Sequence, residues 1–306
     1  LSPVYGDPST GFCIEAECGA TLDSILAAAS AKNLVFRPNP TEKTATIGGL
    51  FATGSSGCNS YRWGKTADHV LSAEIITPEG DLLEIRRGEH FFDEHGCILP
   101  NGTRIYINKY PKLSGVCSFT PFIGMDLLDL FAGSEGMLGI VARVKLALSP
   151  KQCEPWGIVF FFSGHDTAAS FVKAVTEMDK ESGHKQSRVS FLEFFDKNTL
   201  SLIRLHRENV SSLKKIPDIP SRHSCAVYLE LEEMNEEDVE GKLAGLLELF
   251  ENLGGQESDT WAAAGSTEVE KFRLFRHAAP EAVNARVDYF RKSYPAAYKM
   301  CIDISA

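Results

Sequence analysis

The sequence feature that most constrains the fold is a glycine-rich stretch in the first quarter of the chain. TATIGGLFATGSSGCNSYRWGKTADHV, from Thr44 to Val70, contains five glycines and few charged residues. Glycine has no Cβ atom, so its backbone N–H groups can approach a flat or anionic ligand closely. The same composition also fits plain turns between strands. On its own, the stretch therefore predicts either a binding surface or a set of turns.

Two common nucleotide-binding motifs are excluded by the spacing of these glycines. Neither GxGxxG nor GxxxxGK[ST] occurs in the stretch, so neither the Rossmann nor the P-loop mechanism is supported. A second cluster of small residues, GSEGMLGI, follows from Gly133 to Ile140. Taken together, the two clusters favour a binding surface built from two segments.

These clusters and their surroundings resemble a known family. The matching elements are TATIGG, the pair Trp63-Gly64, an Asp-His-Val followed by a strand ending in PEGD, and DLLDLFAGSEGMLGI. They are similar to the FAD-binding domain of the vanillyl-alcohol-oxidase (PCMH) type, in its glycolate oxidase, D-lactate dehydrogenase and D-2-hydroxyglutarate dehydrogenase branch. The resemblance is strongest over residues 44–150 and continues, by the pattern of elements, to Ala306.

The resemblance implies FAD as the cofactor and assigns residues that line it. Family members often carry Asn where this chain has Leu50 and Gly54, so the polar part of the match is reduced. The implied FAD-lining residues are Thr46, Ile47, Gly48, Gly49, Thr53, Gly54, Gly57, Tyr61 and Gly64 from the first cluster, and Glu135, Gly136 and Ile140 from the second.

The resemblance also implies a substrate-binding pair near the end of the chain. KFRLFRHAAPEAVN and AYKMCIDIS are similar to the segment in which hydroxy-acid members hold the substrate carboxylate, which assigns that role to Arg276 and Lys299. A guanidinium binds a carboxylate through two parallel hydrogen bonds, and lysine adds a point charge. Without the resemblance, both residues also fit an ordinary solvated surface.

Periodicity predicts the secondary structure. Apolar and polar residues alternate from Gly11 to Gly19, as in a half-buried strand, and a helix follows Thr21, whose side chain can cap it. From about Pro155, strands and helices alternate in two βαβ-like passes, which is typical of a ferredoxin-like sheet. The last helix is expected from Thr267 to Val287, kinked or split at Pro280.

We therefore expect an α+β fold in two parts. Residues 1–150 would be the second half of a PCMH-type FAD-binding domain, lacking the N-terminal phosphate-loop subdomain, with a long irregular excursion over residues 88–121. Residues 151–306 would be an incomplete ferredoxin-like α/β cap, the substrate domain of FAD-linked oxidases. The resemblance implies a chain truncated at both ends, or one completed by another subunit.

Composition excludes several other classes of protein. The net charge of -10 argues against nucleic acid, and no apolar run reaches the ~20 residues of a membrane span. The eight cysteines form no CxxC and have no histidine at a zinc-like spacing, so we expect reduced thiols and no metal site. The chain starts at Leu1 without a signal peptide, which favours a cytoplasmic protein and hints at an incomplete gene product.

The function implied is FAD-dependent oxidation of a small 2-hydroxy acid, such as D-lactate, glycolate or D-2-hydroxyglutarate, by hydride transfer to the flavin. An unidentified acceptor would then take the electrons, and a homo-oligomer or a partner subunit is compatible with the sequence. Two alternatives stay open. One is a flavin-containing transferase similar to alkylglycerone-phosphate synthase, and the other is a non-catalytic flavoprotein subunit or fragment.

Overall fold

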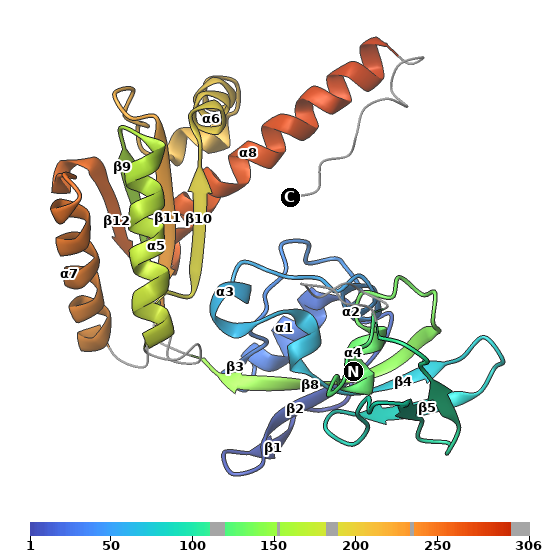
Figure 1. Cartoon of the computed structure of the whole chain (residues 1–306). Helices are drawn as coiled ribbons and strands as arrows, with labels where there is room; N and C mark the ends of the chain where they lie inside the picture. Colours follow the sequence, from blue (N-terminus) through green and yellow to red (C-terminus); the bar gives the residue numbers. More distant parts are fainter. Residues whose placement is uncertain (111–119, 152–153, 182–188, 233–235, 295–306) are drawn as a thin grey trace. The chain divides into compact units, whose positions relative to one another are not determined.

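The computed structural model describes residues 1–110, 120–151, 154–181, 189–232 and 236–294. The chain divides into two compact units, Leu1–Lys151 and Gln152–Ala306, which are described separately (Figure 1). Both units mix helices with antiparallel strands, which confirms the predicted α+β class.

The first unit is built on a six-stranded antiparallel sheet. The central strand β8 (Ile140–Pro150) pairs with β2 (Gly11–Glu17) on one side and β4 (Val70–Ile76) on the other. The outer strands are β1 (Tyr5–Asp7), β5 (Leu82–Arg86) and β3 (Leu34–Val35). A turn joins β4 to β5, and Gly80 takes a φ of 92° there, a conformation that favours glycine.

One face of this sheet is covered by short helices and carries the core. The helices are α1 (Leu22–Ser30), α2 (Ile47–Ala52) and α4 (Leu127–Phe131), and each begins after a side-chain cap: Thr21, Thr46 and Asp126. Their apolar faces bury Ile25, Phe51 and Leu128 against the sheet. The opposite face is polar, with Glu15 beside Lys145 and Glu74 beside Arg143 on neighbouring strands. The core therefore lies on one side of the sheet only.

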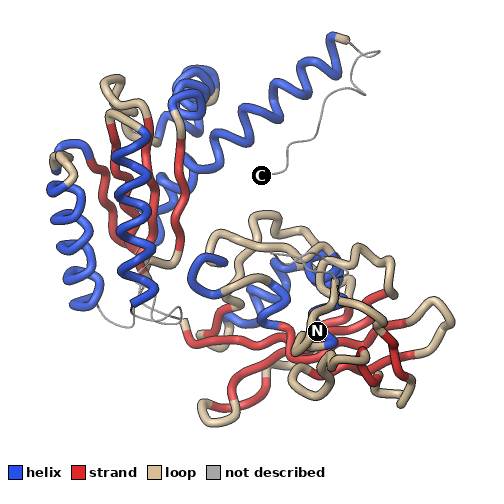
Figure 2. Tube along the Cα trace, viewed as in Figure 1, coloured by secondary structure: helices blue, strands red, loops and turns tan. Residues whose placement is uncertain are grey.

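Two stretches expected to be irregular contain regular structure. The glycine-rich stretch forms α2, α3 (Ser60–Trp63) and the 3-10 turn Thr66–His69, with loops between them (Figure 2). Within the predicted excursion, β6 (Gly96–Ile98) pairs with β7 (Arg104–Tyr106), so that part of the prediction was wrong. Asp93 and Arg104 join the base of this hairpin by an ion pair of 3.1 Å.

The second unit has the predicted ferredoxin-like topology. Its strands are β9 (Trp156–Phe162), β10 (Phe191–Phe195), β11 (Cys225–Leu231) and β12 (Thr260–Ala264), in the spatial order β10-β11-β9-β12 with every neighbouring pair antiparallel. Helix α5 (His165–Glu181) connects β9 to β10, and α7 (Glu236–Asn252) connects β11 to β12. Each connection passes over the strand that lies between its ends, as in a split βαβ unit.

Helices cover both faces of this second sheet. Helices α5 and α7 lie on one face (Figure 1). Phe171 of α5 and Phe250 of α7 pack there against Phe160 of β9. The other face meets α8 (Ser266–Ser293), where Phe275 packs on Phe195. Additional short elements are α6 (Lys197–Asn209) and the 3-10 turns Ser211–Lys215 and Glu257–Asp259.

Helix α8 is longer than predicted, and it is not split at Pro280. It runs for 28 residues with Pro280 inside it. Proline has no N–H group, so the carbonyl of Arg276, four residues earlier, loses its helical donor. Across the described residues, no helix has the length and apolar character needed to cross a membrane.

Candidate functional site

A groove of about 640 Å³ opens in the first unit between the two glycine clusters. It is bordered mostly by small residues, and Glu135 contributes the charged side chain of the lining. The lining residues are Cys18, Gly19, Thr46, Gly48, Gly49, Ala52, Thr53, Glu135, Gly136, Gly139, Ile140 and Val141. Two segments more than 80 residues apart in sequence thus form the walls of one groove.

Backbone hydrogen bonds hold the two walls together. The N–H of Gly133 donates to the carbonyl of Phe51 at 3.1 Å, and the N–H of Glu135 donates to the carbonyl of Ala52 at 2.8 Å. Gly54 lies against this contact with a φ of 62°, and a Cβ atom there would lie 3.2 Å from the Cα of Gly133. The close approach at the end of α2 therefore depends on a small residue.

The first wall is built where β2 ends and α2 begins. Gly48 donates its N–H to the carbonyl of Cys18 at 3.0 Å, and a Cβ atom on Gly48 would lie 2.6 Å from the Cβ of Cys18. The Thr46 hydroxyl accepts the N–H of Gly49, and the Thr53 hydroxyl donates to the carbonyl of Gly49 at 2.9 Å. The two threonines thereby fix the backbone of the TIGG segment along the groove.

Seven of the twelve predicted FAD-lining residues border the groove. They are Thr46, Gly48, Gly49, Thr53, Glu135, Gly136 and Ile140. The lining also includes Cys18, Gly19, Ala52, Gly139 and Val141, which the sequence analysis did not select. A usable signal was present for Gly19, because it ends a predicted strand two residues before the helix cap Thr21.

The other five predicted residues lie elsewhere in the first unit. Ile47 is fully buried in the core, and Tyr61 is exposed. Gly57 packs against the loop before α2, where a Cβ atom would lie 2.0 Å from the carbonyl oxygen of Pro38. Gly64, with a φ of 82°, and Gly54 sit in tight turns. The three glycines among these five residues are therefore explained by the fold, without a ligand.

The groove fits a flat cofactor with a charged linker. Gly19 and Gly136 have no protein atom within 4 Å in the direction of a Cβ, so space opens beside their backbone. Small walls admit an aromatic ring system, and a backbone N–H bond to a charged oxygen contributes ~1.5–3 kcal/mol. Thr46 and Thr53 add hydroxyl groups at one edge. These features suit the ring and pyrophosphate of FAD.

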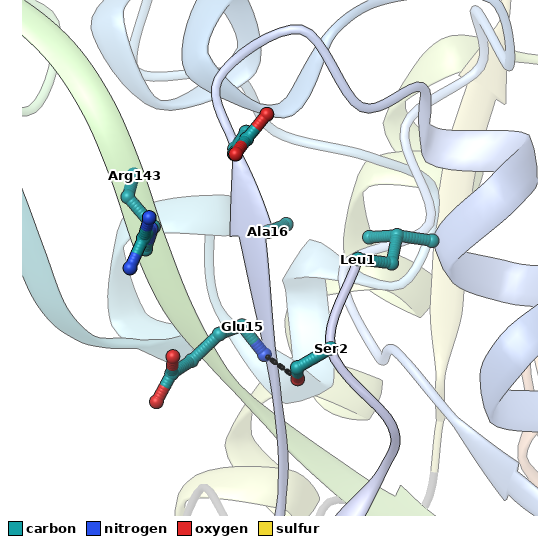
Figure 3. Close-up of a pocket in the computed structure, with 6 residues that line it drawn as sticks. Leu1, Ser2, Glu15, Ala16 and Arg143 are labelled. Carbon is teal, nitrogen blue, oxygen red and sulfur yellow. Dashed lines mark hydrogen bonds between the residues drawn. The ribbon is translucent and has the colours of Figure 1, made fainter.

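A second hollow of about 210 Å³ lies at the polar face of the same sheet (Figure 3). Arg143 lines it together with the carboxylates of Glu15 and Glu17, and Ser2 accepts the backbone N–H of Glu15 at 2.9 Å. Two carboxylates beside one arginine disfavour an anionic cofactor. This hollow is therefore a poorer candidate than the groove.

Half-buried His69 lies at the end of the glycine-rich stretch. Its Nε2 atom is 2.7 Å from the carbonyl oxygen of Trp63, and its ring meets the edge of Phe36. Burial lowers the pKa of His69, outweighing the hydrogen bond to Trp63 and the nearby carboxylate of Asp68, which raise it. The neutral ring therefore fits this site better than the charged one.

Arg276 lies in the second unit, where α8 crosses the sheet. Its Nε group donates to Glu193 at 2.5 Å, and its guanidinium carbon lies 5.2 Å from the centre of the Phe191 ring. Arg273, one turn earlier, donates twice to the buried carboxylate of Glu230, at 2.8 and 3.0 Å. Lys299, the other predicted substrate residue, lies outside the described residues.

A family model matches part of the first unit. Residues 7–86 match the family model described as FAD binding domain. The chain is 27% identical over 150 residues to a D-lactate dehydrogenase of Anaerostipes hadrus, covering 49% of this chain and 26% of that protein. It is 30% identical over 184 residues to glycolate oxidase subunit GlcD of Bacillus subtilis (strain 168), covering 60% of this chain and 31% of that protein.

A solved structure supports the fold as a whole. An alkyldihydroxyacetonephosphate synthase matches 83% of this chain and 39% of its own, with a TM-score of 0.52 and 18% sequence identity. The predicted PCMH-type fold is thereby confirmed. The chain spans less than a third of the length of the two curated relatives described above. Residues 7–86 match an FAD binding domain and the cofactor is FAD; the chain is similar to a D-lactate dehydrogenase and to a glycolate oxidase subunit.

Proposed function

We propose that this protein takes part in the FAD-dependent oxidation of a small 2-hydroxy acid. The observation that carries the proposal is the groove, in which two distant glycine clusters present backbone and small side chains to one space. The D-lactate dehydrogenase and GlcD similarities support a hydroxy acid as the substrate class. D-Lactate, glycolate and D-2-hydroxyglutarate are the first substrates to test.

The groove residues would hold the cofactor mainly through their backbone. Gly19 and Gly136 leave room for close approach, and the hydroxyls of Thr46 and Thr53 orient the segment that they flank. The branched side chain of Ile140 is exposed at the opposite wall and offers apolar contact. Bound FAD would supply an acceptor for the two electrons that leave the substrate.

In this proposal, Arg276 and Lys299 bind the substrate carboxylate. A 2-hydroxy acid has its carboxylate next to the carbon that is oxidised, so a guanidinium fork at the carboxylate also orients that carbon. Arg276 retains 21% exposure of its side chain. Ile47, Gly54, Gly57, Tyr61 and Gly64 would contribute to the cofactor site indirectly, by shaping the segment around the groove.

The test is reconstitution of the whole protein with FAD, followed by anaerobic addition of each hydroxy acid. Oxidised flavin absorbs at roughly 450 nm, and this band is lost when the flavin is reduced. We expect its loss with at least one of the three hydroxy acids. A protein that takes up FAD but is not reduced by any of the three acids would overturn the substrate class. Failure to take up FAD would overturn the role of the groove.

A further inference from the structure

The guanidinium of Arg276 is held on two of its sides. On the first side, its Nε edge donates to Glu193 at 2.5 Å. On the second, its face lies over the ring of Phe191, 5.2 Å from the ring centre. Within the described part of the chain, neither terminal Nη group of Arg276 has a hydrogen-bond partner. The third side therefore presents two NH2 groups that donate to none of the described residues.

Arg273 provides the contrast on the same helix. Both its Nε and Nη2 groups donate to Glu230, whose side chain is 5% exposed. Glu230 also accepts the hydroxyl of Tyr228 at 2.5 Å. Releasing Arg273 would leave a buried carboxylate without its cation, which is strongly unfavourable. Arg273 is thus committed to the fold, whereas Arg276 keeps part of its donor capacity.

Rigid elements position the carboxylate that holds Arg276. Glu193 lies on β10, opposite Tyr228 in the register of the sheet, and shares its face with Phe191 and Phe195. Phe195 packs on Phe275, the residue directly before Arg276, with their ring centres 4.7 Å apart. The ion pair therefore sits next to the contact that fixes α8 on the strand.

We propose that Glu193 is a positioning residue for Arg276. By engaging the Nε edge, it fixes the guanidinium so that the two Nη groups face a ligand carboxylate in parallel. The inference rests on the proposed function, in which Arg276 binds the substrate carboxylate. An arginine held in advance loses less rotamer freedom when the ligand arrives. The carboxylate oxygen acts as an acceptor at a fixed place, and an amide oxygen at the same place can serve as well.

Steady-state kinetics of the FAD-loaded protein separates this role from a general structural one. E193A should lower kcat/KM for the hydroxy acid by about 10- to 100-fold, because a misplaced binding group costs up to about 100-fold. E193Q keeps an acceptor for the Nε group and should stay within about threefold of the wild type. R276K, which lacks the fork, sets the reference for a lost carboxylate contact. E268A removes an exposed pair with Lys271 on the same helix and should leave the kinetics unchanged.

Equal losses in E193A and E193Q, or no loss in either while R276K is impaired, would overturn the inference. A wild-type protein that holds FAD but oxidises no hydroxy acid would instead count against the proposed function. In that case, NMR of 15N-arginine-labelled protein measures how fast the Nε proton of Arg276 exchanges with water. The Nε signal of Arg276 is assigned by its absence from the spectrum of R276K. Slow exchange in the wild type and E193Q, with fast exchange in E193A, supports the positioning of Arg276 by Glu193. Fast exchange in the wild type overturns it.

Discussion

The backbone N–H of Glu135 donates to the carbonyl of Ala52 at 2.8 Å and so joins the two glycine clusters of the chain. Glu135 adopts a φ of 50° to do this, in the left-handed region that few non-glycine residues enter. The groove is thus a property of main-chain geometry, and substitutions that disturb the main chain should affect it most.

Replacing Gly48 with alanine should impair both folding and cofactor binding. The new Cβ would lie 2.6 Å from the Cβ of Cys18, closer than such atoms approach. Overpacking of this kind costs ~1–3 kcal/mol. The expected result is a lower free energy of unfolding in urea, together with weaker FAD binding because Gly48 lines the groove.

The matched control for this change is G241A, in the exposed middle of α7, where a Cβ meets no other atom within 4 Å. Alanine there should raise stability by ~0.5–1 kcal/mol, because glycine is a poor helix former. If G48A unfolds at the wild-type urea concentration, the contact between α2 and the end of β2 is not the constraint described above.

Leucine at Gly19 should block FAD while leaving the fold intact. No protein atom lies within 4 Å of a Cβ at this position, and the residue lines the groove. The added side chain would occupy space that the flavin needs, at no steric cost to the protein. FAD titration by fluorescence should show a loss of binding, and the melting temperature should stay close to that of the wild type. G164L adds the same side chain at another open position in the second unit and should bind FAD normally.

Acidification should destabilise the first unit through His69. Burial lowers the pKa of His69 in the folded state, so the unfolded chain takes up the proton first as the pH falls. Stability should therefore be complete above the unfolded pKa of about 6.5 and decline below it, by no more than about 1.4 kcal/mol per pH unit. Urea unfolding of H69Q, compared with the wild type between pH 8 and 5, should show a shallower decline. Parallel curves for the two proteins would exclude His69 as the source.

Removing the carboxylate of Glu230 should destabilise the second unit strongly. E230A removes the buried carboxylate that accepts hydrogen bonds from Arg273 and Tyr228. Breaking a buried ion pair costs ~3–5 kcal/mol, whereas the exposed pair lost in E268A should cost under ~1 kcal/mol. Chemical unfolding followed by the fluorescence of Trp261, which packs on the same face of the sheet, would measure both changes. Similar midpoints for E230A and E268A would contradict the structural role assigned to Arg273.

The strongly periodic elements could be predicted from the sequence. The alternation in β2, the capped helix after Thr21 and the strand–helix alternation from about Pro155 all agree with the structure. The hairpin β6–β7 was not predicted because its strands have three residues each and many turn-forming neighbours. Strand β12 was not predicted either, because its sequence TWAAA shows little alternation of apolar and polar residues.

The site was predictable only where its chemistry is local. TIGG and GSEG could be selected because of their small residues. Cys18 could not, because it reaches the groove only through the hydrogen bond between Gly48 and the residue that follows β2. The bond between Arg276 and Glu193 links residues 83 positions apart, and no periodicity encodes such a contact. Contacts of this kind depend on strand order and register, which local sequence patterns do not specify.

The main-chain bonds between α2 and the turn at Gly133 have a consequence for how the protein can diverge. Because the atoms that join the walls belong to the backbone, most side-chain replacements at Ala52 leave the bonds in place. Tolerance should instead end abruptly at Gly54, where a Cβ would press on Gly133. In a saturation library selected for flavin retention, variants at Ala52 should accumulate and variants at Gly54 should be depleted.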